Sequence, residues 1–490
     1  MFDPISTSRR EFLRASAIAA GGLLLSPDGA PAQVPPAPAD YTLRIATGLV
    51  ELADDQILST TCYNGQFPGP LLRFKEGKPV VVDIHNDTDT PEQFHWHGQF
   101  LPVDVDGSAE EGTPYIPAHG MRRISFTPRP AGFRFYHTHL LARDNLAGGQ
   151  YSGQVGPVYI EPAREPGAYD QEIFLVLKEF EPAFSRGGDM AMDFLTPGDP
   201  IKPLEEAGET AMKASLAGGA AHGYEVGYSL FSINGRMLGH GEPIKVKQGQ
   251  RVLMHVLNGS ATEIRSLALP GHTFRVIAMD GNPVPTPAEV PVLWIGTGER
   301  VSAVVEMNQP GVWVLGDLGD DDREHGMGIV VEYANQAGKP QWAAPPTFKW
   351  DYTRFAAASA PSRQPDEIID MTFAKRNAAD HGFNLWTING VPFSMDKMEP
   401  TFTLRQGRRY RWRMRNASDD IHPMHLHRHS FELTKFHGKP TSGLIKDVVM
   451  LGGYQEIEVD FTADNPGLTL FHCHMQLHMD YGFMGLFKYV

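Results

Sequence analysis

Two histidines flank a cysteine near the end of the chain, and this triplet, His472, Cys473 and His474, constrains the fold more than any other feature. The residues before it, Leu468 to Phe471, form an apolar run that is typical of a buried strand. Side chains alternate between the two faces of a strand, so both histidines would point one way and the cysteine the other. Thiolate and imidazole ligands suit copper. We therefore expect this one strand to contact two metal centres.

Histidine pairs with a two-residue spacing recur along the chain, and this spacing places both rings on one face of a strand. The four pairs are His95/His97, His137/His139, His425/His427 and His472/His474. Because a single tetrahedral zinc ion accepts only four ligands, eight converging imidazoles predict about two or three metal ions.

Cys473 needs partners of its own on the opposite face of its strand. His478 follows five residues later, and His422 stands three residues before His425. A thiolate with two imidazoles is the trigonal ligand set of a blue-copper electron-transfer site. The sequence thus predicts a histidine cluster and a separate site made by Cys473, His422 and His478.

These residues resemble the four copper motifs of the multicopper oxidases, the family that includes laccases, bilirubin oxidase and bacterial cuprous oxidases. The matching segments are His95-Trp96-His97-Gly98, His137-Thr138-His139, His422-Pro423-Met424-His425-Leu426-His427, and His472-Cys473-His474 followed by His478. They stand in the family's order, and the likeness extends from about Tyr41 to the C-terminus. The resemblance implies an all-β fold of three cupredoxin-like Greek-key β-sandwich domains and a cofactor of four copper ions.

The resemblance also implies a role for each ligand. Cys473, His422 and His478 would hold the type 1 copper, and His95 and His425 the type 2 copper. The type 3 pair would be held by His97, His137, His139, His427, His472 and His474. A reductant would lose one electron at a time at the type 1 site, and four electrons would reduce dioxygen to water at the cluster. Cys473 is bonded to His472 and His474 through the backbone, which gives electrons a short covalent route.

An internal repeat predicts three copies of one β unit. Each copy contains Asn-Gly, a later Gly, eight further residues and a second Asn; the copies run over 64–86, 234–258 and 389–416. Nine and eleven residues after the second Asn lie the first and third histidine pairs, but the middle copy has Leu267 and Leu269 there. We expect the middle domain to keep the fold without ligands, and the cluster to lie between the outer domains. His272 and His429 occupy parallel positions and are interpreted as structural.

The chain of 490 residues is long enough for about three domains. We place them at 33–165, 166–345 and 346–490. An insertion at about 181–222, with a short helix around Leu204 to Leu216, interrupts the second domain. An insertion of this length could cover a substrate entrance, or it could be a plain surface loop.

The first 32 residues have the pattern of a twin-arginine export signal. Ser8-Arg9-Arg10-Glu11-Phe12-Leu13 precedes a short apolar run and the cleavage-like Ala30-Pro31-Ala32. The run is too short for a permanent membrane helix, so we predict a soluble periplasmic protein. A net charge of -15 argues against nucleic acid or an anionic membrane as the main partner. Only two cysteines are present, so with Cys473 on copper we expect Cys62 to be a buried, unpaired strand residue.

The residue expected at the axial position of the type 1 site departs from the family pattern. The family often has methionine five residues after the last type 1 histidine, and this chain has Phe483. Without the weak thioether donor, cupric ion is less stabilised, and the redox potential should be high. The alternative is a shift of the last strand that brings Met484 to the copper.

Acidic residues near the motifs are candidates for proton supply. Asp106 resembles the acid that the family keeps beside the cluster, although a turn-forming Asp-Gly is the alternative interpretation. Some bacterial relatives carry a second acid directly after the last type 1 histidine; here Met479 stands there and Asp480 follows. Asp447 is a weaker candidate for a group near the type 1 histidines.

Two enzymatic interpretations differ in the reductant. One is a laccase-like oxidase of phenols and aromatic amines; the other is a metallo-oxidase of cuprous, ferrous or manganous ions. The 19 methionines are scattered, and only residues 189–193 group Met with Asp, which favours organic substrates. A copper-free structural protein of the cell envelope is a third interpretation, against which the complete ligand set argues.

Overall fold

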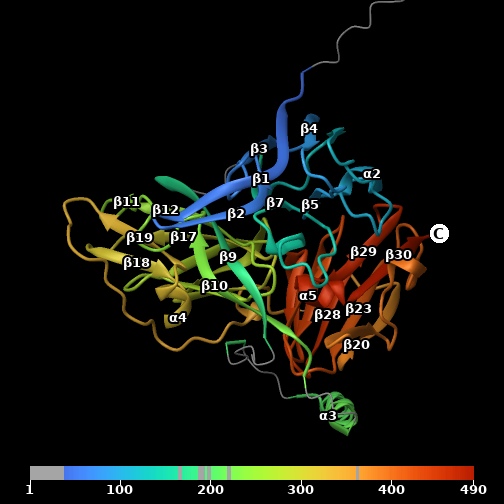
Figure 1. Ribbon diagram of the computed structural model, residues 1–490. Helices are drawn as coiled ribbons and strands as arrows, with labels where there is room; N and C mark the ends of the chain where they lie inside the picture. The colour runs from blue at the N-terminus through green and yellow to red at the C-terminus, as the bar shows by residue number, and fades with distance from the viewer. Residues whose placement is uncertain (1–37, 164–167, 186–193, 196–199, 218–221, 360–362) are drawn as a thin grey trace, which may run out of the picture. The chain divides into compact units, whose positions relative to one another are not determined.

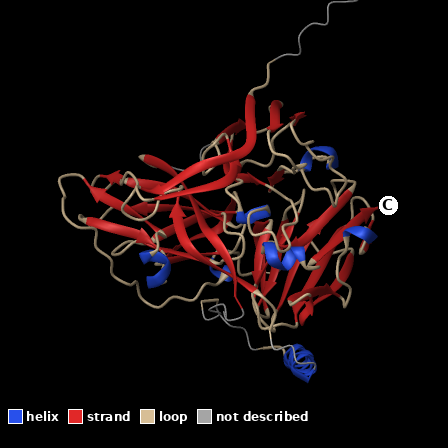
Figure 2. Ribbon diagram, viewed as in Figure 1, coloured by secondary structure: helices blue, strands red, loops and turns tan. Residues whose placement is uncertain are grey.

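The computed structural model describes residues 38–163, 168–185, 194–195, 200–217, 222–359 and 363–490. The predicted export signal and parts of the insertion lie outside the described residues. Strands make up about half of the described chain, and the few helices lie in the connections (Figure 2). This confirms the predicted all-β class. None of the helices in the described part is long and apolar enough to cross a membrane.

The first domain contains two four-stranded sheets, ordered β2-β1-β4-β6 and β3-β8-β7-β5. In the first of these sheets β4 alternates between buried and less buried residues, so that sheet turns one apolar face inward. In the other sheet β7 and β8 are buried along almost their whole length. The elements are β1 (Tyr41–Ala53), β2 (Gln56–Tyr63), β3 (Leu72–Lys75), β4 (Val80–Asn86), β5 (His95–His97), α2 (Val103–Asp106), β6 (Gly120–Phe126), β7 (Gly132–His137), η2 (Gly149–Tyr151) and β8 (Val155–Glu161).

The second domain pairs a six-stranded sheet, β10-β9-β12-β17-β14-β15, with a five-stranded sheet, β11-β19-β18-β13-β16. Its elements are β9 (Gln171–Ser185), α3 (Lys202–Ala217), β10 (Glu225–Ile233), β11 (Ile244–Val246), β12 (Arg251–Asn258), β13 (Arg265–Ala268), β14 (Phe274–Met279), β15 (Asn282–Val290), β16 (Val292–Ile295), β17 (Arg300–Glu306), β18 (Val312–Gly316), α4 (Asp320–Glu324) and β19 (Gly328–Tyr333).

The third domain has the strand orders β21-β20-β23-β28-β25-β26 and β22-β30-β29-β24-β27. Its elements are β20 (Glu367–Asp380), β21 (Phe383–Ile388), η4 (Met395–Lys397), β22 (Phe402–Leu404), β23 (Arg409–Asn416), β24 (His422–Leu426), β25 (Phe431–Phe436), β26 (Lys439–Lys446), β27 (Val448–Leu451), β28 (Glu456–Thr462), β29 (Leu468–Cys473), α5 (Gln476–Asp480) and β30 (Met484–Tyr489). The short helix η3 (Tyr352–Arg354) lies in the connection from the second domain.

The second and third domains have the same topology. Adding eleven to each strand number of the second domain gives the strand orders of the third domain. The first domain is a shorter version without the strands that correspond to β14, β15 and β16. By this correspondence β5, β13 and β24 are equivalent strands, and so are β7, β18 and β29. The histidine-bearing strands of the outer domains therefore occupy matching places, and the middle domain has apolar residues there, including Leu267 on β13.

The repeated asparagines explain why the three copies share a sequence pattern. Asn86, Asn258 and Asn416 end β4, β12 and β23 and are fully buried. The side-chain amide of each donates to backbone carbonyls of the following loop, as Asn416 does to Asp420 and Gly452. Its oxygen accepts the N–H of the residue two positions later. In the outer domains this fixed loop leads into the histidine-bearing strand.

The insertion differs from expectation at its start. Strand β9 does not end at 181 but continues to Ser185, because it pairs with β10 up to Ser185 opposite Glu225. The predicted helix is present as α3, which contacts β20 of the third domain. The insertion therefore joins two domains.

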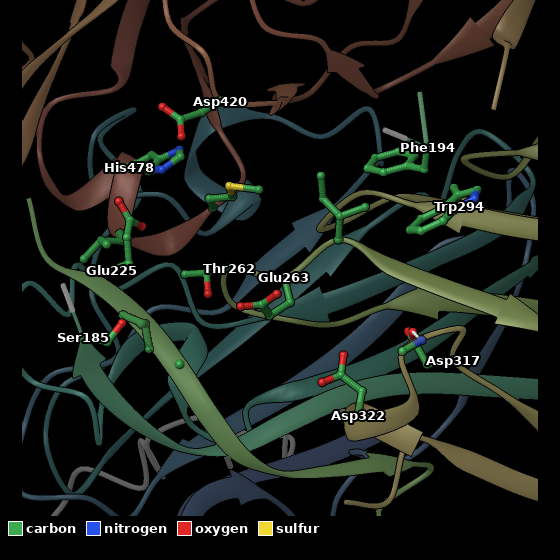
Figure 3. Close-up of a pocket in the computed structure, with 16 residues that line it drawn as sticks. Ser185, Phe194, Glu225, Thr262, Glu263, Trp294, Asp317, Asp322, Asp420 and His478 are labelled. Atoms are coloured by element: carbon green, nitrogen blue, oxygen red, sulfur yellow. Dashed lines mark hydrogen bonds between the residues drawn. The ribbon is translucent and has the colours of Figure 1, made fainter. Parts of the chain in front are cut away.

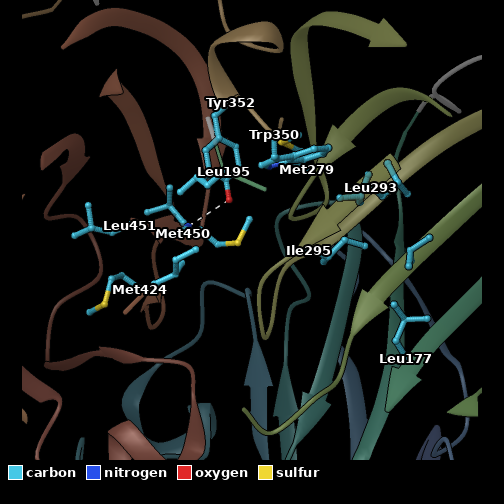
Figure 4. Packing of buried hydrophobic residues seen from close by; sticks show 14 of the residues in the cluster. Leu177, Leu195, Met279, Leu293, Ile295, Trp350, Tyr352, Met424, Met450 and Leu451 are labelled. Carbon is cyan, nitrogen blue, oxygen red and sulfur yellow. Dashed lines mark hydrogen bonds between the residues drawn. The ribbon is translucent and has the colours of Figure 1, made fainter. Parts of the chain in front are cut away.

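A shared apolar core links the second and third domains (Figure 4). Leu293 and Ile295 of β16 belong to the same cluster as Met450 and Leu451 of β27, and the connection between the domains contributes Trp350. All of these side chains are almost completely removed from solvent. Apolar burial is the main favourable term in such an interface, and it fixes the middle domain against the third domain.

Replacing Asn258 with alanine should destabilise the middle domain and leave the histidine cluster of the outer domains unchanged. The change leaves the buried carbonyls of Glu263 and Ile295 without their donor, at a cost of about 1–3 kcal/mol. Chemical denaturation monitored by tryptophan fluorescence measures the effect, with Asn308→Ala at an exposed asparagine of the same domain as control. Equal denaturation midpoints for the two variants would contradict this account of the repeat.

Candidate metal centres

The strands that carry the histidine pairs are hydrogen-bonded to one another. In the first domain β5 runs antiparallel to β7, with His95 opposite His137. In the third domain β24 runs antiparallel to β29, with His425 opposite His472. The two strand pairs are equivalent in topology, and Figure 1 shows β5 and β7 beside the strands of the third domain. The cluster is thus built from two copies of one strand pair.

All eight predicted cluster histidines come together at this interface and are almost fully buried. The rings of His97 and His425 stack with centroids 3.8 Å apart, and those of His95 and His427 with centroids 4.1 Å apart. Ring nitrogens lie within 4.8 Å of one another in several groups of three, including His95/His425/His427 and His139/His427/His472. Each group is small enough to surround one metal ion.

Hydrogen bonds orient the rings so that one nitrogen of each is left for a ligand. Five of the histidines donate Nδ1–H to an oxygen: His95, His137, His425, His427 and His472. Among the described residues the Nε2 atoms of His95, His137 and His425 have no hydrogen-bond partner. Buried polar atoms without a partner are costly, and a metal ion would satisfy them.

Burial favours the neutral, metal-binding form of several of these imidazoles. Burial, together with the neighbouring histidines, holds the pKa of His425 and His427 well below the usual range. The pKa of His474 is lowered to about 3, again chiefly by burial. Eight imidazoles in a closed space are a donor set that fits copper.

The predicted type 1 ligands meet on the other side of β29. The Sγ atom of Cys473 lies 3.5 Å from Nδ1 of His478 and 3.8 Å from Nδ1 of His422. The Trp386 ring packs against both imidazoles, and Ser418 is hydrogen-bonded to Nε2 of His422. Burial raises the pKa of the Cys473 thiol, so metal binding there must displace a proton.

Phe483, rather than Met484, faces this site. The Phe483 ring is fully buried, with its centroid 4.9 Å from that of His422, and it stacks on Trp386. Met484 belongs to a separate apolar cluster with Leu470 and Met479. The geometry therefore favours the interpretation without an axial thioether.

A short segment after β5 supplies three carboxylates to the cluster, of which the sequence analysis singled out one. Asp106 accepts Nδ1–H of His427 through its side chain and that of His95 through its backbone carbonyl. Glu110 lies 3.4 Å from Nδ1 of His139, and Glu111 lies 3.8 Å from Nδ1 of His427. The signal that could have identified both was the acid-rich run from 104 to 111, directly after the first histidine pair.

The expectation for Asp447 was wrong. Its carboxylate lies 3.1 Å from Nε2 of the cluster histidine His97, not beside the type 1 histidines. The reason is the register of β24 and β27, which places Val448 opposite His425 and Leu451 opposite His422. Asp447, the residue before β27, is therefore held beside the histidine cluster and away from His422.

Four other residues named from the sequence have a clear structural setting. Asp480, considered for proton supply, accepts the backbone N–H groups of Ala142 and Arg143 and so ties α5 to the first domain. His272 and His429 are structural, as predicted, because each is hydrogen-bonded to a backbone carbonyl and to a tyrosine hydroxyl. Cys62 is a free, fully buried residue of β2, also as predicted.

A cavity of about 390 Å³ reaches His478, one of the predicted type 1 ligands. Figure 3 shows His478 with Asp420 and Glu225 at one end and the Phe194 and Trp294 rings at the other. These two rings stack with centroids 4.2 Å apart. Phe194 comes from the insertion, so the insertion forms part of the cavity wall. The cavity is large enough for a small aromatic molecule.

Carboxylates dominate the polar lining of this cavity. They are Glu225, Glu263, Asp317, Asp322 and Asp420. Two of them are balanced from outside the cavity, Asp420 by Lys375 at 2.6 Å and Asp322 by Arg265 at 2.6 Å. Burial, reinforced by the charge of Asp420, raises the pKa of Glu225 to about 8. Crowded carboxylates with raised pKa values would be stabilised in their charged form by a cation.

Comparison with known proteins agrees with this geometry. Three family models, each described as multicopper oxidase, match residues 45–165, 206–330 and 362–490. The chain is 30% identical to multicopper oxidase MmcO of Mycobacterium tuberculosis over 446 residues, which cover 89% of this chain and 84% of that protein. It is 25% identical to Laccase-3 of Thanatephorus cucumeris, with 91% and 90% covered. The fold matches that of Fet3p, a multicopper oxidase that functions in iron import, with a TM-score of 0.72, 17% identity, and 92% and 90% covered.

Replacing Phe483 with methionine should lower the reduction potential of a copper bound to Cys473. A thioether beside the three ligands would stabilise cupric over cuprous ion, and each tenfold gain in that preference lowers a one-electron potential by about 59 mV. Redox titration of the thiolate-to-copper absorption band measures the shift, with Phe483→Leu as the control without a donor atom. An unchanged band and potential in Phe483→Met would show that this side chain does not face the copper.

Proposed function

The chain belongs to the multicopper oxidase family, copper oxidoreductases that use dioxygen, and on that premise we propose how its residues divide the work. Cys473, His422 and His478 would hold a type 1 copper, and His95 and His425 a type 2 copper. The type 3 pair would be held by His97, His137, His139, His427, His472 and His474. Bound there, four coppers would supply one-electron oxidation of a reductant and four-electron reduction of dioxygen to water.

The observation that carries this proposal is the double contact of one strand. Cys473 faces His422 and His478, while the residues on either side of it, His472 and His474, face the histidine cluster. Electrons collected at the thiolate therefore have only a few covalent bonds to cross. The backbone N–H of Cys473 donates to Phe483, and that of His474 donates to Pro423, so neighbouring strands hold this route rigidly.

Measurement of copper content and dioxygen uptake by the purified holoprotein tests the proposal. We expect about four copper ions per chain, a strong thiolate-to-copper band, and oxidation of four one-electron equivalents for each dioxygen consumed. Cys473→Ser should abolish the band and the turnover while leaving the histidine cluster its metal. A wild-type protein that binds no copper would favour the copper-free structural interpretation instead.

The cavity beside His478 supports a positively charged reductant. Its carboxylates would attract a cation, and its stacked rings, Phe194 and Trp294, offer an apolar wall for an aromatic group. An aromatic amine that carries a separate cationic group satisfies both features, so we propose laccase-like oxidation of such aromatic amines, with neutral phenols as weaker substrates. The specific observation that favours the metallo-oxidase alternative is the presence of Glu225, Asp420 and Met475 together near His478, since carboxylates and thioethers bind ferrous and cuprous ions.

Replacing Glu225 with glutamine should raise the KM for a cationic reductant and leave that for a neutral phenol nearly unchanged. Above about pH 8, where Glu225 is charged, loss of this carboxylate beside the bound cation is expected to weaken binding by about tenfold, or 1.4 kcal/mol. Because the pKa of Glu225 is raised to about 8, the KM for the cation should fall in wild type as pH rises through that value. Steady-state dioxygen uptake measures both effects.

Glu332→Gln, on β19 away from the cavity, is the matched control for the same loss of charge. Equal changes in the two variants, or a parallel rise in the KM for phenol, would show that the cavity does not select by charge. Comparing an aromatic diamine with ferrous and cuprous ions in the same assay separates the two classes of cationic reductant.

Export to the periplasm through the twin-arginine route is also part of the proposal. It rests on Arg9 and Arg10 and on the short apolar run that follows. Cell fractionation tests it: replacement of both arginines by lysine should retain the protein in the cytoplasm, and unchanged export would contradict the route.

A further inference from the structure

The middle domain, which lacks the predicted ligands, reaches the histidine cluster through one arginine. Arg300, the first residue of β17, is fully buried. Its guanidinium donates to both carboxylate oxygens of Asp447, from Nη1 at 2.6 Å and from Nη2 at 2.6 Å. A two-point pair of this kind fixes the orientation of the carboxylate as well as its charge.

Asp447 in turn contacts two of the cluster histidines. Its side chain accepts Nε2–H of His97 at 3.1 Å, and its backbone carbonyl accepts Nδ1–H of His425 at 2.7 Å. The orientation of His97 is therefore the reverse of the five rings that donate Nδ1–H. With Nε2 occupied, its Nδ1 faces Nε2 of His474 at 3.2 Å, so the carboxylate decides which nitrogen of His97 is left for a metal.

Two glycines make room for this contact between domains. A Cβ atom on Gly98, next to His97, would lie 2.7 Å from Nη2 of Arg300 and 2.7 Å from the Asp447 carboxylate. A Cβ atom on Gly298, two residues before Arg300, would lie 2.8 Å from the ring of His474. Both glycines also have φ near +78°. The close approach of the middle domain to the cluster is thus built into the backbone.

The surrounding charges come from all three domains and balance one another. Arg134 of the first domain lies 3.3 Å from Asp447. Lys446 of the third domain pairs with Asp280 at 2.8 Å and with Glu299 at 3.0 Å. With Arg300, three cations and three anions form one buried network. Removing one partner from such a network leaves an uncompensated charge.

We propose that Arg300 is a positioning residue for the copper cluster, acting through Asp447 on His97 and His425. The inference rests on the proposed function and extends it, because it gives the domain without ligands a direct part in metal binding. Carboxylates that orient metal-bound histidines typically change metal affinity by about 10- to 100-fold when they are lost. The type 1 site, held by other residues, should not depend on Arg300.

Copper retention by the holoprotein tests this role without relying on turnover. Wild type and Arg300→Met are titrated with a copper chelator while total copper per chain and the thiolate-to-copper band are followed. In Arg300→Met we expect cluster copper to be held about 10- to 100-fold more weakly, with the band per chain as in wild type. Full retention of cluster copper would overturn the proposal.

Arg265→Met is the matched control, because Arg265 is a fully buried, ion-paired arginine of the same domain that is bonded to Asp322. It should lose stability but hold both kinds of copper normally. Parallel loss of type 1 and cluster copper in the two variants would also overturn the proposal, because it would indicate general unfolding.

Arg300→Lys keeps the positive charge but cannot bond both carboxylate oxygens of Asp447. If Arg300→Met does not fold, copper retention by Arg300→Lys tests the proposal instead. We expect about tenfold weaker cluster retention, and wild-type retention would overturn the proposal. Dioxygen uptake by wild type distinguishes failure of this inference from failure of the proposed function. If wild type consumes dioxygen normally and the Arg300 variants retain their cluster copper, only this inference fails. A wild type without copper defeats the proposed function and this inference together.

Discussion

The alternation of side chains along β29 is the constraint on which the rest of the structure depends. Three consecutive residues face two sites, and this works only if the backbone stays extended at Cys473. Pairing with β24 and β30 enforces that extension, with His472 opposite His425 on one side and opposite Met484 on the other. A shift of one residue in either pairing would exchange the thiolate with an imidazole. The register of β29 with its neighbouring strands therefore determines which side chain faces each proposed metal site.

The comparison of the three domains shows how a metal site can be lost without loss of the fold. Leu267 and Leu269 stand where the outer domains have histidines, and both are buried. Isolated buried imidazoles would cost free energy without a metal to satisfy them, whereas leucines fill the same space with apolar contacts. The asparagine that fixes the preceding loop is needed for the fold in all copies, which is why Asn258 remains.

Much of this architecture was accessible from sequence because it depends on local periodicity. The two-residue spacing of the histidines predicted strands, and the repeat predicted which copy lacks the ligands. Contacts made across domain boundaries were not accessible. The acid-rich run 104–111 could have pointed to Glu111, but its contact with His427 of another domain could not be derived from that run. Asp447 was assigned to the wrong site since the register of β27 cannot be read from its sequence. The insertion begins later than the expected residue 181 for a similar reason, because β9 continues to Ser185 only through its pairing with β10.

The charges around the type 1 site meet two requirements that conflict. Carboxylates near a cationic reductant promote its binding, but negative charge near the copper would stabilise cupric ion and weaken it as an oxidant. Lys375 offsets this effect, because it pairs with Asp419 and Asp420 at 2.6 Å and lies over Trp386, which packs on both type 1 histidines. Glu225 lies near His478 in the same cavity, where its raised pKa limits its negative charge. With copper bound at the proposed type 1 site, this arrangement and Phe483 in place of a thioether would let an acidic cavity open onto a strongly oxidising centre.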